Sequence, residues 1–230
     1  SVHERTRVFL KVQDGCDYNC SFCTIPMARG KSRSNTIDKV MQDVEEIAKG
    51  GAQEVVLTGI NLGDFGKTEG GQREHEECFY DLLKAIDDKA LVPRIRISSI
   101  EPNLLENRIV EMVANSRTIM PHFHIPLQSG SDRILGLMRR RYRKDLYAQK
   151  IGLIKTLMPH AGIGVDVITG FPGETDEDFA ETADFLSQLD ISYLHVFTYS
   201  ERDNTYALEL PGVVPMEKRN ERTRSEEHTS

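Results

Sequence analysis

The 230-residue chain is 39% hydrophobic and carries a formal net charge of -7, so it can bury one sizeable core but is not a wholly basic nucleic-acid binder. No apolar run approaches the roughly 20 residues that a membrane-spanning helix requires, and the N-terminal stretch SVHERTR lacks the apolar segment of a signal peptide. We therefore expect a soluble, cytoplasmic protein with no membrane partner, in which any RNA-binding surface is local or lies outside this chain.

The predicted elements alternate between strands and helices. The run RVFLKVQD predicts a first strand that ends at a cysteine-rich loop. Apolar residues then recur at helical spacing from Ile37 to Ala48, and Gly50 and Gly51 end this helix. The β-branched run EVVLTG predicts the second strand, which leads through a Gly-rich loop to a helix that begins near Phe79.

The same alternation continues beyond this helix. RIRISS predicts the third strand, and the helix after it begins at about Asn103, whose side chain would cap it with Glu106 three residues later. HFHIPL predicts the fourth strand, after which Ser131 would cap one helix and another begins near Arg143. GIGVDVITG and LHVFTY complete six strands, separated by a helix that Thr175 would cap. The predicted buried face of that helix consists of Phe179, Ala183 and Leu186.

Six such units predict an α/β fold with a parallel sheet covered by helices and right-handed crossovers. A closed or partly closed barrel and an open doubly wound sheet both fit this pattern. In either architecture the chemistry belongs at the C-terminal ends of the strands. The notable sequences fall at these strand ends: CDYNCSFC, LTGIN, SSIEP and LQSGS after the first four strands, DVITGFPGE at the fifth and TYS at the sixth. We therefore expect these loops to meet at one mouth.

Three of the four cysteines, Cys16, Cys20 and Cys23, lie in the first of these loops, and the distant Cys78 is expected to be structural. This spacing suits a metal site better than a disulfide framework. A zinc site would normally show a fourth ligand nearby, and a thioredoxin-like pair would leave Cys16 unexplained. An iron-sulfur cluster held by three thiolates leaves one iron open to an external ligand. The cluster uses every cysteine of the loop, while zinc and thiol redox chemistry stay open on chemical grounds.

The spacing CxxxCxxC at the mouth of a parallel β/α barrel resembles the radical S-adenosylmethionine (SAM) superfamily over nearly the whole chain. The resemblance implies a partial (β/α)6 barrel of the TIM type and a 4Fe-4S cluster on Cys16, Cys20 and Cys23. It implies further that SAM chelates the open iron. One electron, from a donor such as flavodoxin or ferredoxin, then cleaves SAM to a 5'-deoxyadenosyl radical.

The resemblance also implies a SAM-binding site. Phe22 would pack on the adenine, although it could equally belong to the core. Arg140, in MRRRY, would pair with the SAM carboxylate through its guanidinium fork. The second-strand motif that would receive the amino group comprises Thr58, Gly59 and Asn61, with a plain turn as the alternative. Further candidates for the ribose or sulfonium are Glu101, Gln128, Ser129 and Asp166. Of these, Ser129 could be only a helix cap.

Two other groups of side chains have open interpretations. His122 and His124 alternate along a strand and so share one face, as a metal pair or, as we prefer, as tucked strand histidines. Arg29, Lys31 and Arg33 directly follow the cysteines and could neutralise the cluster, contact RNA or form a solvated face.

Several stretches together resemble the methylthiotransferases, which insert a methylthio group into tRNA or a ribosomal protein. These stretches are PMARGKSRS, SSIEP, HIPLQSGSDRIL, MRRRY, DVITGFPGET and HVFTYS. SSIEP, HIPLQSGS with MRRRY, and HVFTYS most resemble the members that act on N6-threonylcarbamoyladenosine next to the anticodon, ahead of those that act on isopentenyladenosine or a ribosomal protein. ERDNT departs from the usual Arg-Pro-Gly-Thr type of turn, which puts the substrate-side loop in doubt. Other hypotheses are a different radical enzyme, such as a porphyrinogen oxidase relative, and a non-catalytic zinc-binding barrel.

The same resemblance implies domains that this chain does not contain: an N-terminal one holding a second, auxiliary 4Fe-4S cluster and a TRAM-like RNA-binding one at the C-terminus. The full-length protein would bind tRNA. We expect the barrel at residues 1–205, the start of a linker at 206–223 and a non-native tail at 224–230, because RSEEHTS resembles a translated sequencing adapter. The chain thus reads as a fragment.

Overall fold

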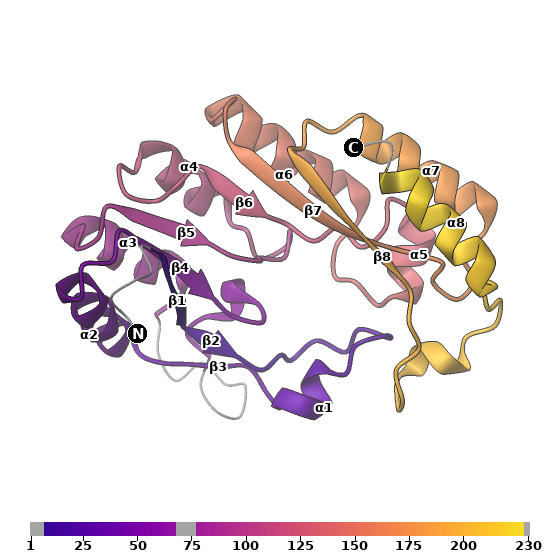
Figure 1. Cartoon of the computed structure of the whole chain (residues 1–230), viewed down its shortest axis with the longest axis horizontal. Helices are drawn as coiled ribbons and strands as arrows, with labels where there is room; N and C mark the ends of the chain where they lie inside the picture. The colour runs from indigo at the N-terminus through magenta and orange to yellow at the C-terminus, as the bar shows by residue number, and fades with distance from the viewer. Residues whose placement is uncertain (1–6, 68–76, 228–230) are drawn as a thin grey trace.

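The computed structural model describes residues 7–67 and 77–227, which form a curved parallel sheet with helices on one face (Figure 1). The parallel strands are β1 (Arg7–Lys11), β4 (Glu54–Thr58), β5 (Arg94–Ile97), β6 (His122–His124), β7 (Gly162–Thr169) and β8 (Tyr193–Thr198). They form two three-stranded sheets in the orders β1-β4-β5 and β6-β7-β8. Parallel bridges from Ile95 to Ile119 and from Ser99 to His124 join β5 to the β6 segment. The prediction of an α/β fold with six parallel strands is confirmed.

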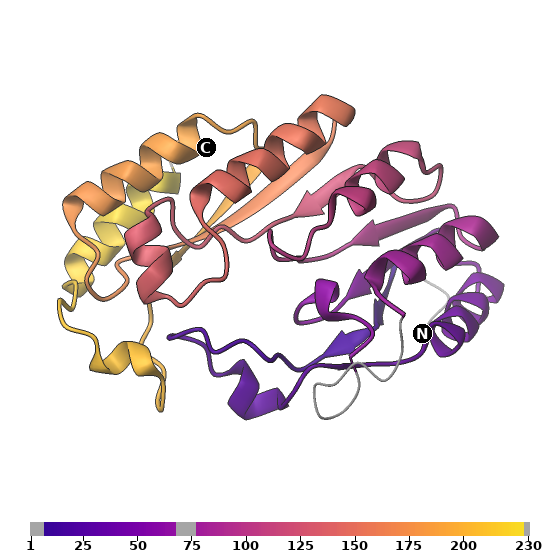
Figure 2. The same cartoon turned by 180° about the vertical axis from the view of Figure 1, so that it is seen from behind.

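A helix follows each of the first five strands, as the sequence predicted. These helices are α2 (Ile37–Lys49), α3 (Phe79–Lys89), α4 (Asn107–Asn115), α5 (Asp132–Leu137) with α6 (Lys144–Leu157), and α7 (Asp176–Ser187). Viewed from behind, the helices lie in front of the strands (Figure 2). Their apolar stripes and the helix-facing side chains of the strands, such as Val55 and Val165, form one large core. This packing leaves the opposite face of the strands, here called the inner face, free of these helices.

Local chemistry explains the ends of α2. Its buried residues are Val40, Met41 and Val44, which recur at helical spacing. The Thr36 hydroxyl accepts the Lys39 N–H at the first turn, and Gly51 follows the helix with φ 82°. The predicted helix end at the glycine pair is confirmed. Residues 68–76 of the Gly-rich loop before α3 lie outside the described residues.

Two of the predicted helix caps are wrong. Helix α4 begins at Asn107 with Glu106 at its N-cap, and Asn103 instead donates its side-chain amide to the Tyr18 hydroxyl at 3.2 Å. Ser131 stands at the N-cap position of α5, but its hydroxyl donates to the Asp178 carboxylate at 2.8 Å. Short polar side chains near helix starts bind other groups when tertiary contacts offer a better partner.

Helix α7 begins as predicted and packs differently from the prediction. Thr175 and Asp178 form the reciprocal cap at its start. Its buried residues are Asp178, Thr182 and Leu186, whereas Phe179 and Ala183 are only half-buried. The reason is that this helix packs on the polar loop after β6, where the Thr182 hydroxyl accepts the Gly130 N–H at 3.0 Å. Polar residues on the buried face therefore satisfy the loop backbone.

The first predicted strand is shorter than expected. Strand β1 ends at Lys11, and β2 (Gln13–Asp14) pairs antiparallel with β3 (Arg33–Ser34). The buried Gln13 amide donates to Gly15 O at 2.8 Å and to the Ser32 hydroxyl at 2.9 Å, which turns the chain away from the sheet. The β2–β3 pair thus closes the base of the cysteine loop, which also contains α1 (Ile25–Arg29).

The chain continues beyond β8 through η3 (Tyr206–Glu209) and α8 (Met216–Glu227), both within the segment predicted as linker and tail. Helix α8 lies against β7 and β8, and its Arg219 and Arg222 side chains are buried. Residues 228–230 of the predicted tail lie outside the described residues. None of the helices in the described part of the chain is long and apolar enough to cross a membrane.

Candidate functional site

A cavity of about 230 Å³ lies at the C-terminal ends of β4, β5 and β6, next to the cysteine loop. We call it the cysteine pocket. Its lining comprises Cys16, Cys20, Phe22, Cys23, Ile25, Ile60, Asn61, Ser99, Glu101, Pro126, Gln128 and Arg140. The structure therefore brings together eight of the twelve residues that the sequence singled out, from four loops at strand ends and, for Arg140, from the segment between α5 and α6.

The cysteine loop holds its three thiols around this pocket. The backbone N–H groups of Tyr18 and Ile25 donate to the sulfur atoms of Cys16 and Cys23, both at 3.4 Å. Gly15 is required at the base of the loop, because it has φ 70° and a Cβ there would lie 2.0 Å from a backbone oxygen. Three cysteines that line one pocket, with N–H donors to two of the sulfur atoms, suit an iron-sulfur cluster, whose properties depend on such hydrogen bonds.

Burial has the largest effect on the pKa of two of these thiols, Cys16 and Cys20. It raises the pKa of Cys16 to about 11, and it raises the pKa of Cys20 even though the Arg140 guanidinium opposes this. Without metal, both thiols are protonated at neutral pH, so metal or cluster binding must release protons. Cys78 lies apart, buried at the N-cap of α3, where its thiol donates to Asp81 at 3.0 Å.

A buried ion pair spans one wall of the pocket. Arg140 donates to Glu101 Oε1 at 2.7 Å and to the Cys20 sulfur at 3.1 Å, and its Nε donates to the Tyr142 hydroxyl at 3.2 Å. Burial raises the pKa of Glu101, and the Arg140 charge opposes this shift. The guanidinium fork is thus divided between a carboxylate and a cysteine ligand, an arrangement that the sequence did not suggest. Its pairing with the SAM carboxylate stays a prediction.

Two acceptor atoms lining the pocket have no hydrogen-bond partner among the described residues: Asn61 Oδ1 and Glu101 Oε2. A buried polar atom left unpaired costs about 1–3 kcal/mol, so such atoms point to a ligand. SAM carries an ammonium group and ribose hydroxyls, which are the donors that these atoms require. Gln128 adds a second signal, because it holds a left-handed backbone with φ 69° at the pocket wall. The residues present therefore fit SAM next to a cluster.

The remaining predicted residues lie outside this lining. Thr58 and Gly59 line a neighbouring cavity together with Lys11, Gln13, Asp14, Arg29 and Ile60. Ser129 is buried, and its hydroxyl lies 3.3 Å from that of Thr182. Asp166 lies on the inner face, against His124 and His195. Their predicted SAM contacts stay predictions.

Two polar residues in or next to the site, Gln13 and Ser99, were missed. Gln13 Oε1 accepts the backbone N–H of Asn61 at 2.9 Å and so ties the cysteine loop to the second strand end. Ser99 lines the pocket and lies 2.6 Å from His124 Nδ1. Ser99 could have been found as a polar residue directly after the third strand, whereas nothing in the sequence marks Gln13.

The strand histidines and the basic residues after the cysteines, which the sequence left open, also have partners in the structure. His122 Nε2 lies 2.9 Å from the Tyr193 hydroxyl, so the two histidines of β6 serve different partners. Among the basic residues that follow the cysteines, Arg33 pairs with Asp14 at 3.1 Å. Contact of this segment with RNA stays a prediction.

A sequence model of the Radical SAM superfamily matches residues 10–186. Together with the barrel and the cysteine pocket, this match defines the class: the chain belongs to the radical SAM superfamily. Membership implies a 4Fe-4S cluster and SAM as cofactors.

The curated relatives of this chain include two kinds of tRNA-modifying enzyme. The chain is 41% identical over 96% of its length to the threonylcarbamoyladenosine tRNA methylthiotransferase MtaB of Aquifex aeolicus, of which it covers 52%. It is 40% identical over 95% of its length to MtaB of Bacillus subtilis, of which it covers 48%. The tRNA-2-methylthio-N(6)-dimethylallyladenosine synthase of Pelotomaculum thermopropionicum follows at 36% identity over 95% of the chain and 48% of that protein. The predicted resemblance to methylthiotransferases is confirmed, and the chain spans about half the length of these relatives.

Solved structures agree on the fold. The coproporphyrinogen III oxidase HemN of Escherichia coli superimposes with a TM-score of 0.69 at 14% identity, covering 98% of this chain and 52% of that one. The radical SAM methyltransferase TsrM of Kitasatospora setae gives a TM-score of 0.69 at 16% identity, covering 83% of this chain and 35% of that one. At such identities the likeness concerns the fold alone.

Proposed function

We propose that this chain is the radical-generating barrel of a tRNA methylthiotransferase whose substrate is N6-threonylcarbamoyladenosine. The observation that carries the proposal is the cysteine pocket, in which three thiols, a buried Arg140–Glu101 pair and two unpaired acceptors meet at the strand ends. The substrate rests on the relatives, since the identity to MtaB proteins reaches 41% and that to the dimethylallyladenosine synthases 36%.

The residues divide into two groups by role. Cys16, Cys20 and Cys23 would hold the cluster, which when bound supplies the electron for reductive cleavage of SAM. Asn61 Oδ1 and Glu101 Oε2 would accept hydrogen bonds from SAM. The partly buried Phe22 ring packs edge-on against Phe171 at 6.1 Å between centroids and would present its exposed side to the adenine.

The chain would act as one part of a longer protein. The sulfur that is inserted would come from an auxiliary cluster outside this chain, and tRNA binding would depend mainly on surfaces elsewhere, because a chain of net charge -7 binds polyanions weakly at physiological salt. The target adenine must leave the anticodon stack to reach the barrel mouth. An external electron donor of the flavodoxin or ferredoxin type would reduce the cluster.

Anaerobic reconstitution tests the cluster. We expect about one 4Fe-4S cluster per chain by iron and sulfide analysis, no cluster in Cys20→Ala, and an unchanged content in Cys78→Ala, a matched control outside the pocket. Zinc bound by the three cysteines in place of iron-sulfur absorbance would contradict the assignment.

A chimera tests the substrate. Residues 7–223 would replace the matching segment of the Bacillus subtilis relative in a strain that lacks this activity, and tRNA nucleosides would be measured by mass spectrometry. We expect the 2-methylthio derivative of threonylcarbamoyladenosine from the chimera and none from its Cys20→Ala variant. Product on isopentenyladenosine instead would transfer the assignment to the sister enzyme. The isolated chain should cleave SAM without forming either product.

A further inference from the structure

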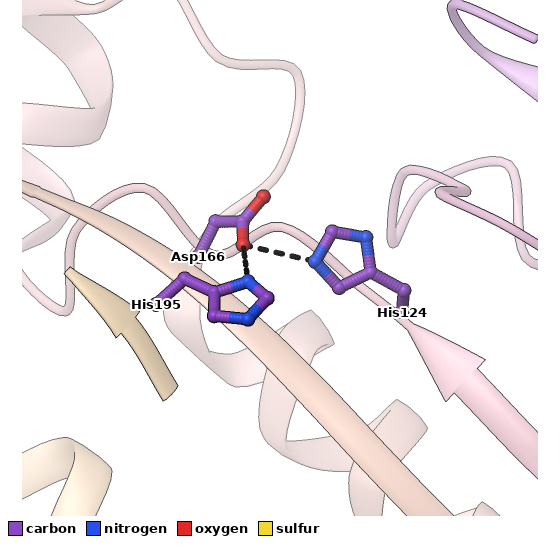
Figure 3. Close-up of side chains that lie close together, drawn as sticks. All are labelled: His124, Asp166 and His195. Carbon is purple, nitrogen blue, oxygen red and sulfur yellow. Dashed lines mark hydrogen bonds and ion pairs between the residues drawn. The ribbon is translucent and has the colours of Figure 1, made fainter. Parts of the chain in front are cut away.

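The inner face of the sheet carries a second cluster of metal-ligating side chains, apart from the cysteine pocket. It consists of His124, Asp166 and His195, one from each of three adjacent parallel strands (Figure 3). Asp166 is the register partner of His195, and His124 is the partner of Gly164, two residues before Asp166. Because side chains alternate along a strand, this register sends all three to the same face. None of the three lines the cysteine pocket.

We propose that His124, Asp166 and His195 bind one divalent transition-metal ion of the zinc type. His124 Nε2 lies 2.9 Å and His195 Nδ1 lies 3.1 Å from Asp166 Oδ1, and the three atoms lie within 4.8 Å of one another. Tetrahedral zinc, with bonds of about 2.0–2.1 Å to nitrogen and oxygen, holds its ligand atoms about 3.3 Å apart. The distances from Asp166 Oδ1 to His124 Nε2 and to His195 Nδ1 therefore need to grow by only a few tenths of an ångström to admit the ion. Two imidazoles and one carboxylate are ligands that zinc and related divalent ions accept.

Neighbouring groups hold the ligands in place. The Ser99 hydroxyl lies 2.6 Å from His124 Nδ1 and can accept its proton in a hydrogen bond, which leaves Nε2 free for the ion. The Tyr193 ring lies 5.2 Å from the His195 ring between centroids and passes over Gly164, where a Cβ would collide with it. Glycine at position 164 therefore makes room for the ring beside the ligand set.

The exposure of the cluster indicates what kind of site it is. The side chains of His124 and Asp166 are each 18% exposed, whereas that of His195 is 55% exposed. An ion can thus reach the site from the open inner face. Three protein ligands leave a fourth position for water or another oxygen donor, as in catalytic rather than structural zinc sites. Without an ion, Asp166 Oδ1 can accept hydrogen bonds from both rings, so the test must distinguish a metal site from a hydrogen-bonded triad.

The experiment titrates zinc into the anaerobically reconstituted protein, in which the cysteines already hold their cluster. Calorimetry and metal analysis should give one zinc per chain in addition to the cluster iron. Asp166→Asn and His195→Ala should each weaken zinc binding more than about a hundredfold, and Ser99→Ala about tenfold. His160→Ala changes an exposed histidine outside the cluster and should leave zinc binding unchanged.

X-ray absorption at the zinc edge identifies the ligands. A shell of nitrogen and oxygen at about 2.0–2.1 Å without sulfur is expected, whereas zinc on the cysteines would show sulfur at about 2.3 Å. The proposal would be overturned by a sulfur shell or by the absence of stoichiometric zinc. It would also be overturned if His160→Ala and His195→Ala lost equal zinc affinity. His195 is exposed enough for its replacement to leave folding intact, and cluster content of each variant verifies this. The two sites share no ligand, so zinc bound in addition to the cluster reports on His124, Asp166 and His195 and not on the cysteines.

Discussion

The buried ion pair between Arg222 on α8 and Glu174 after β7 provides a quantitative test of how α8 is attached. Arg222 Nη1 donates to Glu174 Oε1 at 2.5 Å, and the two side chains are 5% and 3% exposed. Gly170 N–H is the other described donor to this carboxylate oxygen, at 2.8 Å. Burial raises the pKa of Glu174, and the Arg222 charge opposes this shift. Arg222→Met would leave a buried carboxylate without its counter-charge.

The cost of this change has an upper limit, because Glu174 can take up a proton instead of remaining charged. Protonation of a carboxyl with an ordinary pKa of about 4.3 costs about 3.7 kcal/mol at pH 7, at about 1.36 kcal/mol per pH unit. Since burial already raises this pKa in the intact protein, we expect a loss below this limit, of about 2–3 kcal/mol at pH 7. In the variant the folded-state pKa lies well above the unfolded one, so the folded state binds more protons. Stability therefore falls as pH rises between these two values, and the loss should shrink to about 1 kcal/mol or less at pH 5.

Urea unfolding followed by circular dichroism at pH 7 and pH 5 measures these losses. The double variant Arg222→Met/Glu174→Gln should recover most of the stability at pH 7, because it removes both charges. Lys218→Met is the matched control on the same helix, since Lys218 pairs with the exposed Asp176 and should contribute little. An equal loss at both pH values would refute the protonation argument. No loss at pH 7 would show that α8 does not dock through this pair.

Three further predictions concern the two sites. Arg140→Ala should raise the SAM concentration for half-maximal release of 5'-deoxyadenosine roughly tenfold to a hundredfold at unchanged cluster content, and unchanged affinity would remove Arg140 from the site. Gly15→Ala, with φ 70° and a Cβ 2.0 Å from a backbone oxygen, should lower the iron bound on reconstitution, and full iron content would show that the loop adapts. Gly164→Ala should cost about 1–3 kcal/mol in urea unfolding, because its Cβ would lie 2.1 Å from the Tyr193 ring, and this cost should largely disappear in the background of Tyr193→Ala.

The strand and helix order was predictable because it depends on local patterns. Continuous apolar runs such as EVVLT and amphipathic spacing such as that of α2 are properties of short windows. The convergence of the loops after β1, β4, β5 and β6 on one pocket followed from a general rule for parallel sheets, which places all strand C-termini at one edge, whereas no residue that follows β7 or β8 lines this pocket. The cysteines, Phe22, Asn61, Glu101, Gln128 and Arg140 accordingly share a cavity.

Details that depend on tertiary partners were not predictable in this way. Asn103 and Ser131 have the residue types of helix caps, yet each binds a group distant in sequence, namely Tyr18 and Asp178. The buried face of α7 contains Thr182 because a loop backbone from another β/α unit requires an acceptor there. No window of sequence around these residues contains the partner, so propensity alone gave the wrong answer.

The His124–Asp166–His195 cluster shows the same limit at the level of register. The alternation of His122 and His124 was visible, and Asp166 was singled out as a candidate SAM contact, but His195 in LHVFTY carried no signal of its own. What joins the three is the alignment of β6, β7 and β8, in which Asp166 stands opposite His195. A shift of that alignment by one residue would pair Asp166 with a residue whose side chain points to the helices and would separate the two groups. Spacing within one strand predicts which side chains share a face, whereas a site built across strands becomes visible only when their register is known.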